Sequence, residues 1–294
     1  RNPGPGWGYT FLQLCDRFLP DSIFKGARFL ASGIALLLMP QQRKHSATYL
    51  SKILPRPVAP IDLWLHFDAF AQILIAKLRI PLGFTYHCTL AQNPSSLDFE
   101  NWLQSTAPML LGTFHVGASD LLGFQLGGVE KRRIHLVREQ VGNSSDTEQL
   151  SKQYGDWIQF IWVNNQQDLI FSLKDTLSQD DTIVALQCDR INFSSRTEAF
   201  DFLGAKRLFP FTIYHLAAIF QRPVLLSVGI PSSENTCTLH CSPQFTPNPS
   251  ESRKETLQRA KIHFQNFLSH LESLLHSNPY LWFNFLELNP VATP

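Results

Sequence analysis

A histidine and an aspartate five positions apart, His115 and Asp120, are the residues in this chain best suited to catalysis. They follow a short apolar run, and Gly117 between them makes a sharp turn inexpensive. On a continuous helix, five residues rotate the chain by about 500°, which would point the two side chains apart. If His115 instead ends a buried strand and Asp120 opens the next helix, the imidazole can act as a general base that the carboxylate orients.

The spacing by itself is weak evidence for such a pair. With 10 histidines and 24 acidic residues in 294, roughly 0.8 occurrences of this spacing are expected by chance. A solvated loop histidine, followed by a carboxylate that a helix dipole stabilises, fits the same residues. The choice between the two interpretations depends on the elements around them.

From about residue 105 onward, apolar runs of strand length alternate with helix-like stretches. This alternation predicts an α/β fold with a mostly parallel central sheet flanked by helices. The predicted strands are Pro108–Phe114, Arg133–Val137, Ile158–Val163, Thr182–Gln187, Val224–Gly229 and Cys237–Cys241. The predicted helices between them are Ser119–Leu126, Asp146–Tyr154, Gln166–Leu177 and Phe211–Phe220. Ligands of such sheets bind beyond the carboxyl ends of the strands, and His115 follows one of those ends.

Two regions are expected: a helical N-terminal region over residues 1–100, and an α/β domain over 101–294 with a covering C-terminal helix. Ser252 and Glu255 form a capping box for that last helix. Within Ile61–Leu78, an aromatic stripe of Trp64, Phe67 and Phe70 has helical spacing. The stripe either lines an acyl-chain tunnel or packs in the core.

A helix near residues 22–39 is the most membrane-like segment. Its uncharged part, Phe29–Met39, is too short to cross a bilayer. It predicts either a helix lying at a membrane interface or one packed in the protein core.

The composition favours contact with lipid and argues against several classes of partner. Charged residues make up 17% of the chain and phenylalanine alone numbers 23, which is more apolar than a typical soluble enzyme. A net charge of +1 without a basic block gives no reason to expect nucleic acid. Five scattered cysteines do not form a disulfide framework, so reduced thiols in a cytosolic compartment are expected. No secretory signal peptide is recognised, and the sequence, which begins with Arg1 and not with methionine, leaves open whether leading residues are missing.

Several segments occur in an order that is similar to one known family. They are His115–Asp120, Val137-Arg138, Cys188-Asp189 with the later Phe202-Leu203-Gly204, and Pro279–Phe285. Together they resemble the bacterial lipid A biosynthesis (late) acyltransferases, within the glycerophospholipid acyltransferase fold group. The chain departs from that family at Gly117-Ala118-Ser119, where Gly-Asn-Trp is usual, and at Val137 and Arg190, where Tyr and Gln are usual.

The resemblance implies transfer of an acyl group from an acyl carrier protein or coenzyme A thioester to a hydroxyl of a lipid or glycolipid. It implies direct attack by the acceptor, no cofactor or metal, and a peripheral location at the cytoplasmic face of the bacterial inner membrane. In this interpretation His115 is the base, Asp120 orients it, and Arg138 binds a phosphate or the oxyanion. Asp189 and Arg190 follow a predicted strand, line the same crevice and are expected to bind substrate.

Each of these assignments has a plainer alternative. Arg138 can form a surface ion pair with Glu139 or Glu130, and Asp189 with Arg190 can form an internal salt bridge. Cys188 ends an apolar strand, as a buried structural thiol does, and the alternative is a thiol nucleophile. At the level of function, the alternatives are a glycerophosphate-type acyltransferase, a non-catalytic acyl-lipid-binding subunit, and a serine or thiol hydrolase.

Overall fold

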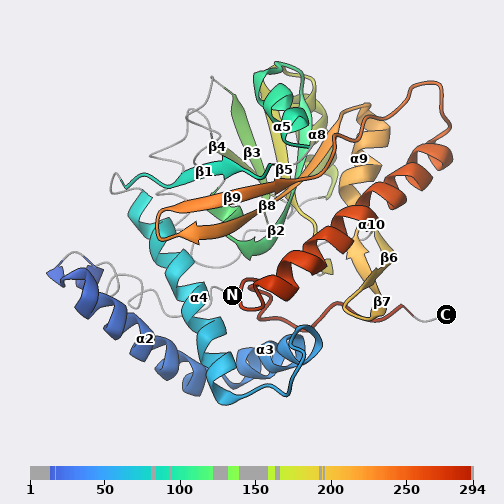
Figure 1. The fold of residues 1–294 in the computed structure, drawn as a ribbon. Helices are drawn as coiled ribbons and strands as arrows, with labels where there is room; N and C mark the ends of the chain where they lie inside the picture. Colours follow the sequence, from blue (N-terminus) through green and yellow to red (C-terminus); the bar gives the residue numbers. More distant parts are fainter. Residues whose placement is uncertain are drawn as a thin grey trace. The chain divides into compact units, whose positions relative to one another are not determined.

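The chain divides into two compact units, which we describe separately. The first contains the described residues up to Thr85 together with Ser273–Leu288, and the second contains Tyr86–Glu272 with the residues from Asn289 onward. The computed structural model (Figure 1) describes residues 14–16, 18–80, 84–92, 95–121, 132–138, 158–162, 166–191, 194 and 196–292.

The second unit is built on a seven-stranded sheet with the order β1-β9-β8-β2-β5-β3-β4, so β2 is its central strand (Figure 1). All neighbouring strands are parallel except β8 and β9, which are antiparallel. The expected α/β fold with a mostly parallel sheet is therefore confirmed. The strands are β1 (His87–Leu90), β2 (Met109–Gly117), β3 (Arg133–Arg138), β4 (Ile158–Trp162), β5 (Thr182–Gln187), β8 (Val224–Ser233) and β9 (Thr236–Cys241).

Helices connect and cover these strands because the apolar runs need burial on both faces. The described helices of this unit are α5 (Ser95–Gln104), α8 (Gln166–Leu177), α9 (Thr212–Phe220) and α10 (Arg253–Ser277), of which α10 runs on into the first unit from Ser273. On one face of β2, Phe114 is fully buried and its ring lies 5.3 Å from that of Phe267 and 6.2 Å from that of Phe264, both on α10. The predicted helix Asp146–Tyr154 lies outside the described residues.

Besides the helix α5, two further features of this unit were not individually predicted from the sequence. One is the short edge strand β1. The other is a separate antiparallel hairpin of β6 (Thr197–Phe202) and β7 (Ala205–Pro210). The hairpin turn needs positive φ at both central residues, and Leu203 (51°) and Gly204 (72°) supply it. Phe200 and Phe209 from its two strands then pack against Phe264 of α10.

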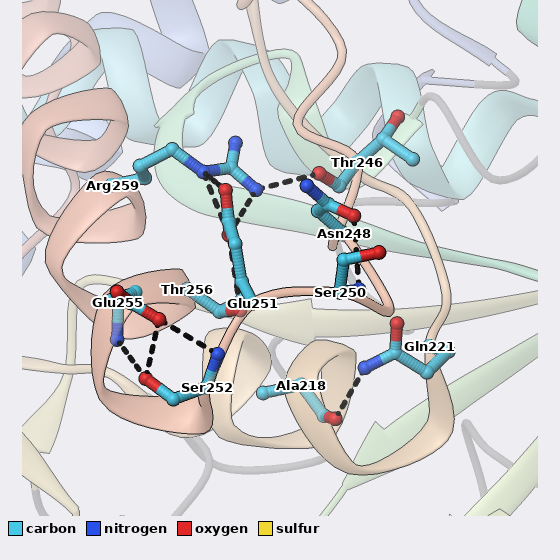
Figure 2. Close-up of polar contacts among 10 residues, drawn as sticks. All are labelled: Ala218, Gln221, Thr246, Asn248, Ser250, Glu251, Ser252, Glu255, Thr256 and Arg259. Carbon is cyan, nitrogen blue, oxygen red and sulfur yellow. Dashed lines mark hydrogen bonds and ion pairs between the residues drawn. The ribbon is translucent and has the colours of Figure 1, made fainter.

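The N-terminus of α10 is held by the predicted capping box, which is confirmed (Figure 2). The backbone N–H of Ser252 donates to Glu255 Oε2 at 2.8 Å, and the N–H of Glu255 donates back to Ser252 Oγ at 3.3 Å. Arg259, one turn further along, pairs with Glu251 at 2.9 Å and donates to the carbonyl of Thr246 at 3.1 Å. These contacts fix the loop that leads into the helix.

The first unit contains α2 (Asp21–Leu38), α3 (Pro40–Ile53) and α4 (Pro60–Arg79). One face of α2 packs on α4, where the Trp64 ring stacks on Phe29 at 4.6 Å and its Nε1–H donates to the Phe29 carbonyl at 2.6 Å. On the same side, Arg28 forms a bidentate ion pair with Asp68 at 3.0 Å. The opposite face of α2 is apolar and exposed, and we call it the α2 apolar face; it comprises Ile23, Leu30, Ile34, Leu37 and Leu38.

No single helix in the described ranges has both the length and the apolar character needed to cross a membrane. Residues Ser22–Leu38 and Pro40–Ile53 meet that test only when taken together, and the chain bends by 101° between them.

The aromatic stripe of α4 belongs to the core of the first unit. Phe67 is buried with its ring edge-on to Phe285, and Phe70 meets both Phe283 and Phe285. The C-terminal segment that carries part of the family resemblance is thus the packing partner of the stripe. The core-packing alternative accounts for Phe67 and Phe70.

Candidate active site

His115 and Asp189 form a two-point contact at the carboxyl edge of the sheet. The ring Nδ1 of His115 lies 2.8 Å from Asp189 Oδ1, and the backbone N–H of His115 donates to Asp189 Oδ2 at 2.9 Å. The Asp189 side chain is 1% exposed and that of His115 is 13% exposed. One carboxylate therefore holds both the backbone and the ring of the histidine.

The pairing of β2 with β5 explains why these two residues meet. The strands are parallel, with Thr113 opposite Gln187, and the N–H of Cys188 continues the ladder to the Thr113 carbonyl at 2.8 Å. His115 and Asp189 each lie two residues beyond that pair, so they lie side by side where the pairing of β2 with β5 ends. Both belong to the carboxyl edge, where open α/β sheets bind ligands.

The contact determines which ring nitrogen of His115 carries the proton. An ionised carboxylate only accepts hydrogen bonds, so Nδ1 must be the protonated nitrogen. Nε2 then carries the lone pair, and none of the residues that the structure describes hydrogen-bonds to it. A neutral imidazole in this tautomer can accept a proton at Nε2 while Asp189 stabilises the imidazolium that forms.

The turn after His115 is held against β8 by hydrogen bonds with Gly229. Gly117 has φ of 51°, a left-handed conformation that favours glycine, and a Cβ there would lie 2.3 Å from the Gly229 carbonyl oxygen. The same carbonyl accepts the N–H of Ala118 at 2.7 Å. Ser119 Oγ accepts the Gly229 N–H at 3.1 Å and donates to the Val116 carbonyl at 2.6 Å. The sharp turn expected from Gly117 is present, and its hydrogen bonds fix the peptide that carries His115.

Asp120, the expected partner of His115, lies in a short 3-10 helix, Ser119–Leu121. Its side chain is outside the described part of the structure, as is the rest of the predicted helix Ser119–Leu126. The pairing of His115 with Asp120 therefore stays a prediction. The acidic partner that the structure does give His115 is Asp189, which the sequence analysis had assigned to substrate binding.

Arg138 and Arg190 belong to the neighbouring strand ends. Arg138 is the last residue of β3, two positions beyond the Leu136 that pairs with Ala185 of β5, and its side chain lies outside the described residues. Arg190 directly follows Asp189 and is half-buried. The substrate-binding roles of both arginines stay predictions.

Cys188 is buried beside Asp189, and its environment disfavours a nucleophile. Burial raises the pKa of the Cys188 thiol, and the neighbouring Asp189 carboxylate raises it further. A thiol that remains protonated at neutral pH is a weak nucleophile, so the geometry supports the structural role for Cys188.

A groove of about 510 Å³ opens elsewhere on this unit, between the C-terminal ends of α8 and α9. Its walls include Phe171, Leu177, Ile219 and Arg222. These helix ends precede β5 and β8, so the groove belongs to the amino edge of the sheet, opposite the edge that carries His115. It does not extend the candidate site.

Within the described ranges, no three His, Cys, Asp or Glu side chains converge in a way that could hold a metal ion. Comparison with known proteins adds no assignment, because no protein-family model matches the chain and no curated protein matches its sequence. The chemistry must therefore be argued from the site itself.

Proposed function

We propose that this protein is a membrane-peripheral acyltransferase that moves an acyl group from a carrier thioester to a hydroxyl of a lipid or glycolipid. The observation that carries the proposal is the His115–Asp189 pair, with the Nε2 of His115 available at the carboxyl edge of the sheet. The ordered motifs that resemble the late acyltransferases of lipid A biosynthesis support the same reaction. Acyl carrier protein is the first donor to test and coenzyme A the second.

The proposed reaction transfers one proton and exchanges one bond at the carbonyl carbon. Nε2 of His115 takes the proton of the acceptor hydroxyl, and the resulting oxygen nucleophile attacks the thioester carbonyl. The tetrahedral intermediate then collapses with loss of the carbon–sulfur bond, and the leaving thiolate recovers the proton from the imidazolium. The products are an ester and the free thiol of the carrier. A positioned general base of this kind contributes roughly 10²- to 10⁴-fold to the rate.

Three further residues have proposed roles around this pair. Asp120 lies in the short 3-10 helix after the turn, and the role proposed for it is the one expected from the sequence, that of a carboxylate that orients His115. Arg138 and Arg190 bind the phosphate groups of donor or acceptor, as planar guanidinium groups do well. These assignments rest on the resemblance and on the shared carboxyl edge.

The α2 apolar face supports the membrane part of the proposal. Its five side chains are between 57% and 76% exposed, while Phe24 and Leu36 on the other side of the helix are buried. A helix with this division lies in the interface of a membrane with its apolar side toward the acyl chains. We propose the cytoplasmic face of the bacterial inner membrane as its location.

Vesicle binding tests this part directly. We expect the double variant Leu30→Ser, Ile34→Ser to bind vesicles of phosphatidylethanolamine and phosphatidylglycerol at least about tenfold more weakly, because each substitution removes about 1 kcal/mol of apolar burial. Ile219→Ser is the matched control, since Ile219 is also exposed but lies on α9 of the other unit. Equal binding by the double variant and the wild type would exclude the α2 apolar face as the membrane surface.

Acyl transfer is tested by following thiol release and lipid products together. The full chain is given palmitoyl thioesters of acyl carrier protein and of coenzyme A. Each donor is combined with glycerol 3-phosphate, a lysophospholipid or an underacylated lipid A precursor. We expect thiol release to depend on one of the lipid acceptors and to be abolished in His115→Ala. His87→Ala is the control, because His87 is exposed at the start of β1.

The products distinguish the remaining alternatives. Acylation of glycerol 3-phosphate identifies a glycerophosphate-type acyltransferase. Thiol release that yields free fatty acid without any ester product identifies a hydrolase. Lipid binding without thiol release, unchanged in His115→Ala, identifies a non-catalytic subunit and refutes the proposal.

A further inference from the structure

Two cysteine side chains meet at the edge of the sheet, away from the strand ends that carry His115 and Asp189. Strands β1 and β9 are parallel, with Cys88 directly opposite Cys237, and the two Sγ atoms lie 2.9 Å apart. All five cysteines belong to the described part of the chain, and none of them forms a disulfide. The contact is therefore one between two thiols.

The backbone at this position suits a covalent bond between the two sulfur atoms. Neighbouring strands of a sheet lie about 4.8 Å apart, and disulfides bridge Cα atoms separated by about 4.4 to 6.8 Å. Because Cys88 and Cys237 are paired in register and their sulfur atoms are already in contact, closure needs only a small rotation of the side chains.

We infer that Cys88 and Cys237 form a dithiol site that closes reversibly to a disulfide by exchange with a small-molecule disulfide. The thiolate of Cys88 attacks one sulfur of the reagent and displaces the first small thiol, which leaves a mixed disulfide on Cys88. The Cys237 thiolate then attacks Cys88 Sγ and displaces the second small thiol. Overall, the protein loses two hydrogen atoms and the reagent is reduced to two thiols.

The different environments of the two cysteines set this order. Cys88 is half-buried and is the more accessible of the two to a reagent, whereas Cys237 is completely buried. The hydrogen bond with Cys88 raises the pKa of the Cys237 thiol, and burial raises it further. Modification of Cys88 removes the first of these causes and leaves a disulfide sulfur within direct reach of Cys237, so attack by Cys237 follows modification of its neighbour.

Closure has a structural consequence because β1 is weakly held. It has four residues, and among the strands that the structure describes it pairs with β9 alone. Just before it, Tyr86 is buried and its hydroxyl donates to the Thr236 carbonyl of β9 at 3.4 Å. A disulfide between positions 149 residues apart would tie this edge covalently to β9 and suppress its local opening.

The test uses the full chain, oxidised glutathione as the reagent, and mass spectrometry after acid quenching. We expect the wild type to lose two hydrogen atoms, to yield a peptide pair linking Cys88 to Cys237, and to revert with dithiothreitol. Cys237→Ala should stop at a stable mixed disulfide on Cys88, and Cys88→Ser should leave Cys237 unmodified. Cys241→Ala is the matched control on the same strand and should close like the wild type.

Hydrogen exchange of the β1 amides provides a second measurement on the same samples. We expect it to slow on oxidation of the wild type and to stay unchanged in Cys88→Ser, where a hydroxyl of similar size replaces the thiol of a half-buried side chain. A mixed disulfide that persists on Cys88 of the wild type, a bond to another cysteine, or a bond between two chains would overturn the inference. Closure without slower exchange in β1 would overturn its structural consequence. None of these readouts depends on acyl transfer.

Discussion

Asp189→Asn separates the geometry of the candidate site from its protonation state. Asp189 faces two hydrogen-bond donors, the backbone N–H of His115 and the ring Nδ1–H. An asparagine keeps the size of the side chain but offers one carbonyl oxygen and one NH₂ group. The backbone N–H can only donate a hydrogen bond, so the asparagine oxygen must turn toward it. The NH₂ group then faces Nδ1 and favours the tautomer in which Nδ1 accepts and Nε2 carries the proton.

A protonated Nε2 cannot act as a base, so the expected loss is most of the general-base contribution. We expect kcat to fall between about 10²- and 10⁴-fold, which corresponds to about 3 to 5 kcal/mol in activation free energy. The free energy of unfolding should fall by less than about 1.5 kcal/mol, because both donors and acceptors remain partnered. Asp189→Ala should lower the free energy of unfolding further, because the backbone N–H of His115 then loses the carboxylate that accepts its hydrogen bond.

The assay is acyl transfer to the acceptor identified by thiol release, with the ¹⁵N shifts of the His115 ring as a direct report of the tautomer. Asp201→Asn is the matched control, since Asp201 is an exposed aspartate that pairs with Lys206 on the surface. A variant that keeps Nδ1 protonated, or that transfers acyl groups within threefold of the wild-type rate, would refute the tautomer argument.

Three further predictions concern the stability of the two units. Burial lowers the pKa of His66 to about 4 in the folded state, while the unfolded chain binds the proton near 6.5. Protonation of His66 should therefore lower the free energy of unfolding by up to about 3 kcal/mol as the pH drops from 6.5 to 4. Urea titrations should show a smaller pH dependence in His66→Gln by about that amount, because the other buried histidines still contribute. Gly117→Ala should destabilise the second unit by at least about 2 kcal/mol in thermal unfolding, because the added Cβ would clash with the Gly229 carbonyl. Gly204 also has a positive φ, but a Cβ there would meet no neighbouring atom, so Gly204→Ala should cost about 1 kcal/mol. Equal costs for the two variants would show that the clash at Gly117 is relieved. Ser252→Ala should cost about 1 kcal/mol through loss of the α10 cap, with Ser250→Ala close to neutral.

The elements that surround the site could be predicted from local pattern. The apolar patterns of β2, β3, β5 and α8 are long enough to distinguish strand from helix. Their bounds agree with the predicted ones to within a few residues. Gly117 marked the turn after His115 because few other residues tolerate its backbone angle. The hairpin of β6 and β7 was missed, because its strands are short and carry charged residues, and burial of Phe200 and Phe209 depends on α10.

The partner of His115 could not be predicted in the same way. Spacing along the chain favoured Asp120, five residues away, whereas the described partner Asp189 is 74 residues away. Asp189 becomes adjacent only because β5 pairs with β2, and that choice of neighbour is made by the packing of the whole sheet. The sequence alone therefore determined which residue types end each strand and where the chain must turn. The tertiary structure decided which strand ends lie together, because strand order depends on contacts between distant segments that no local pattern records.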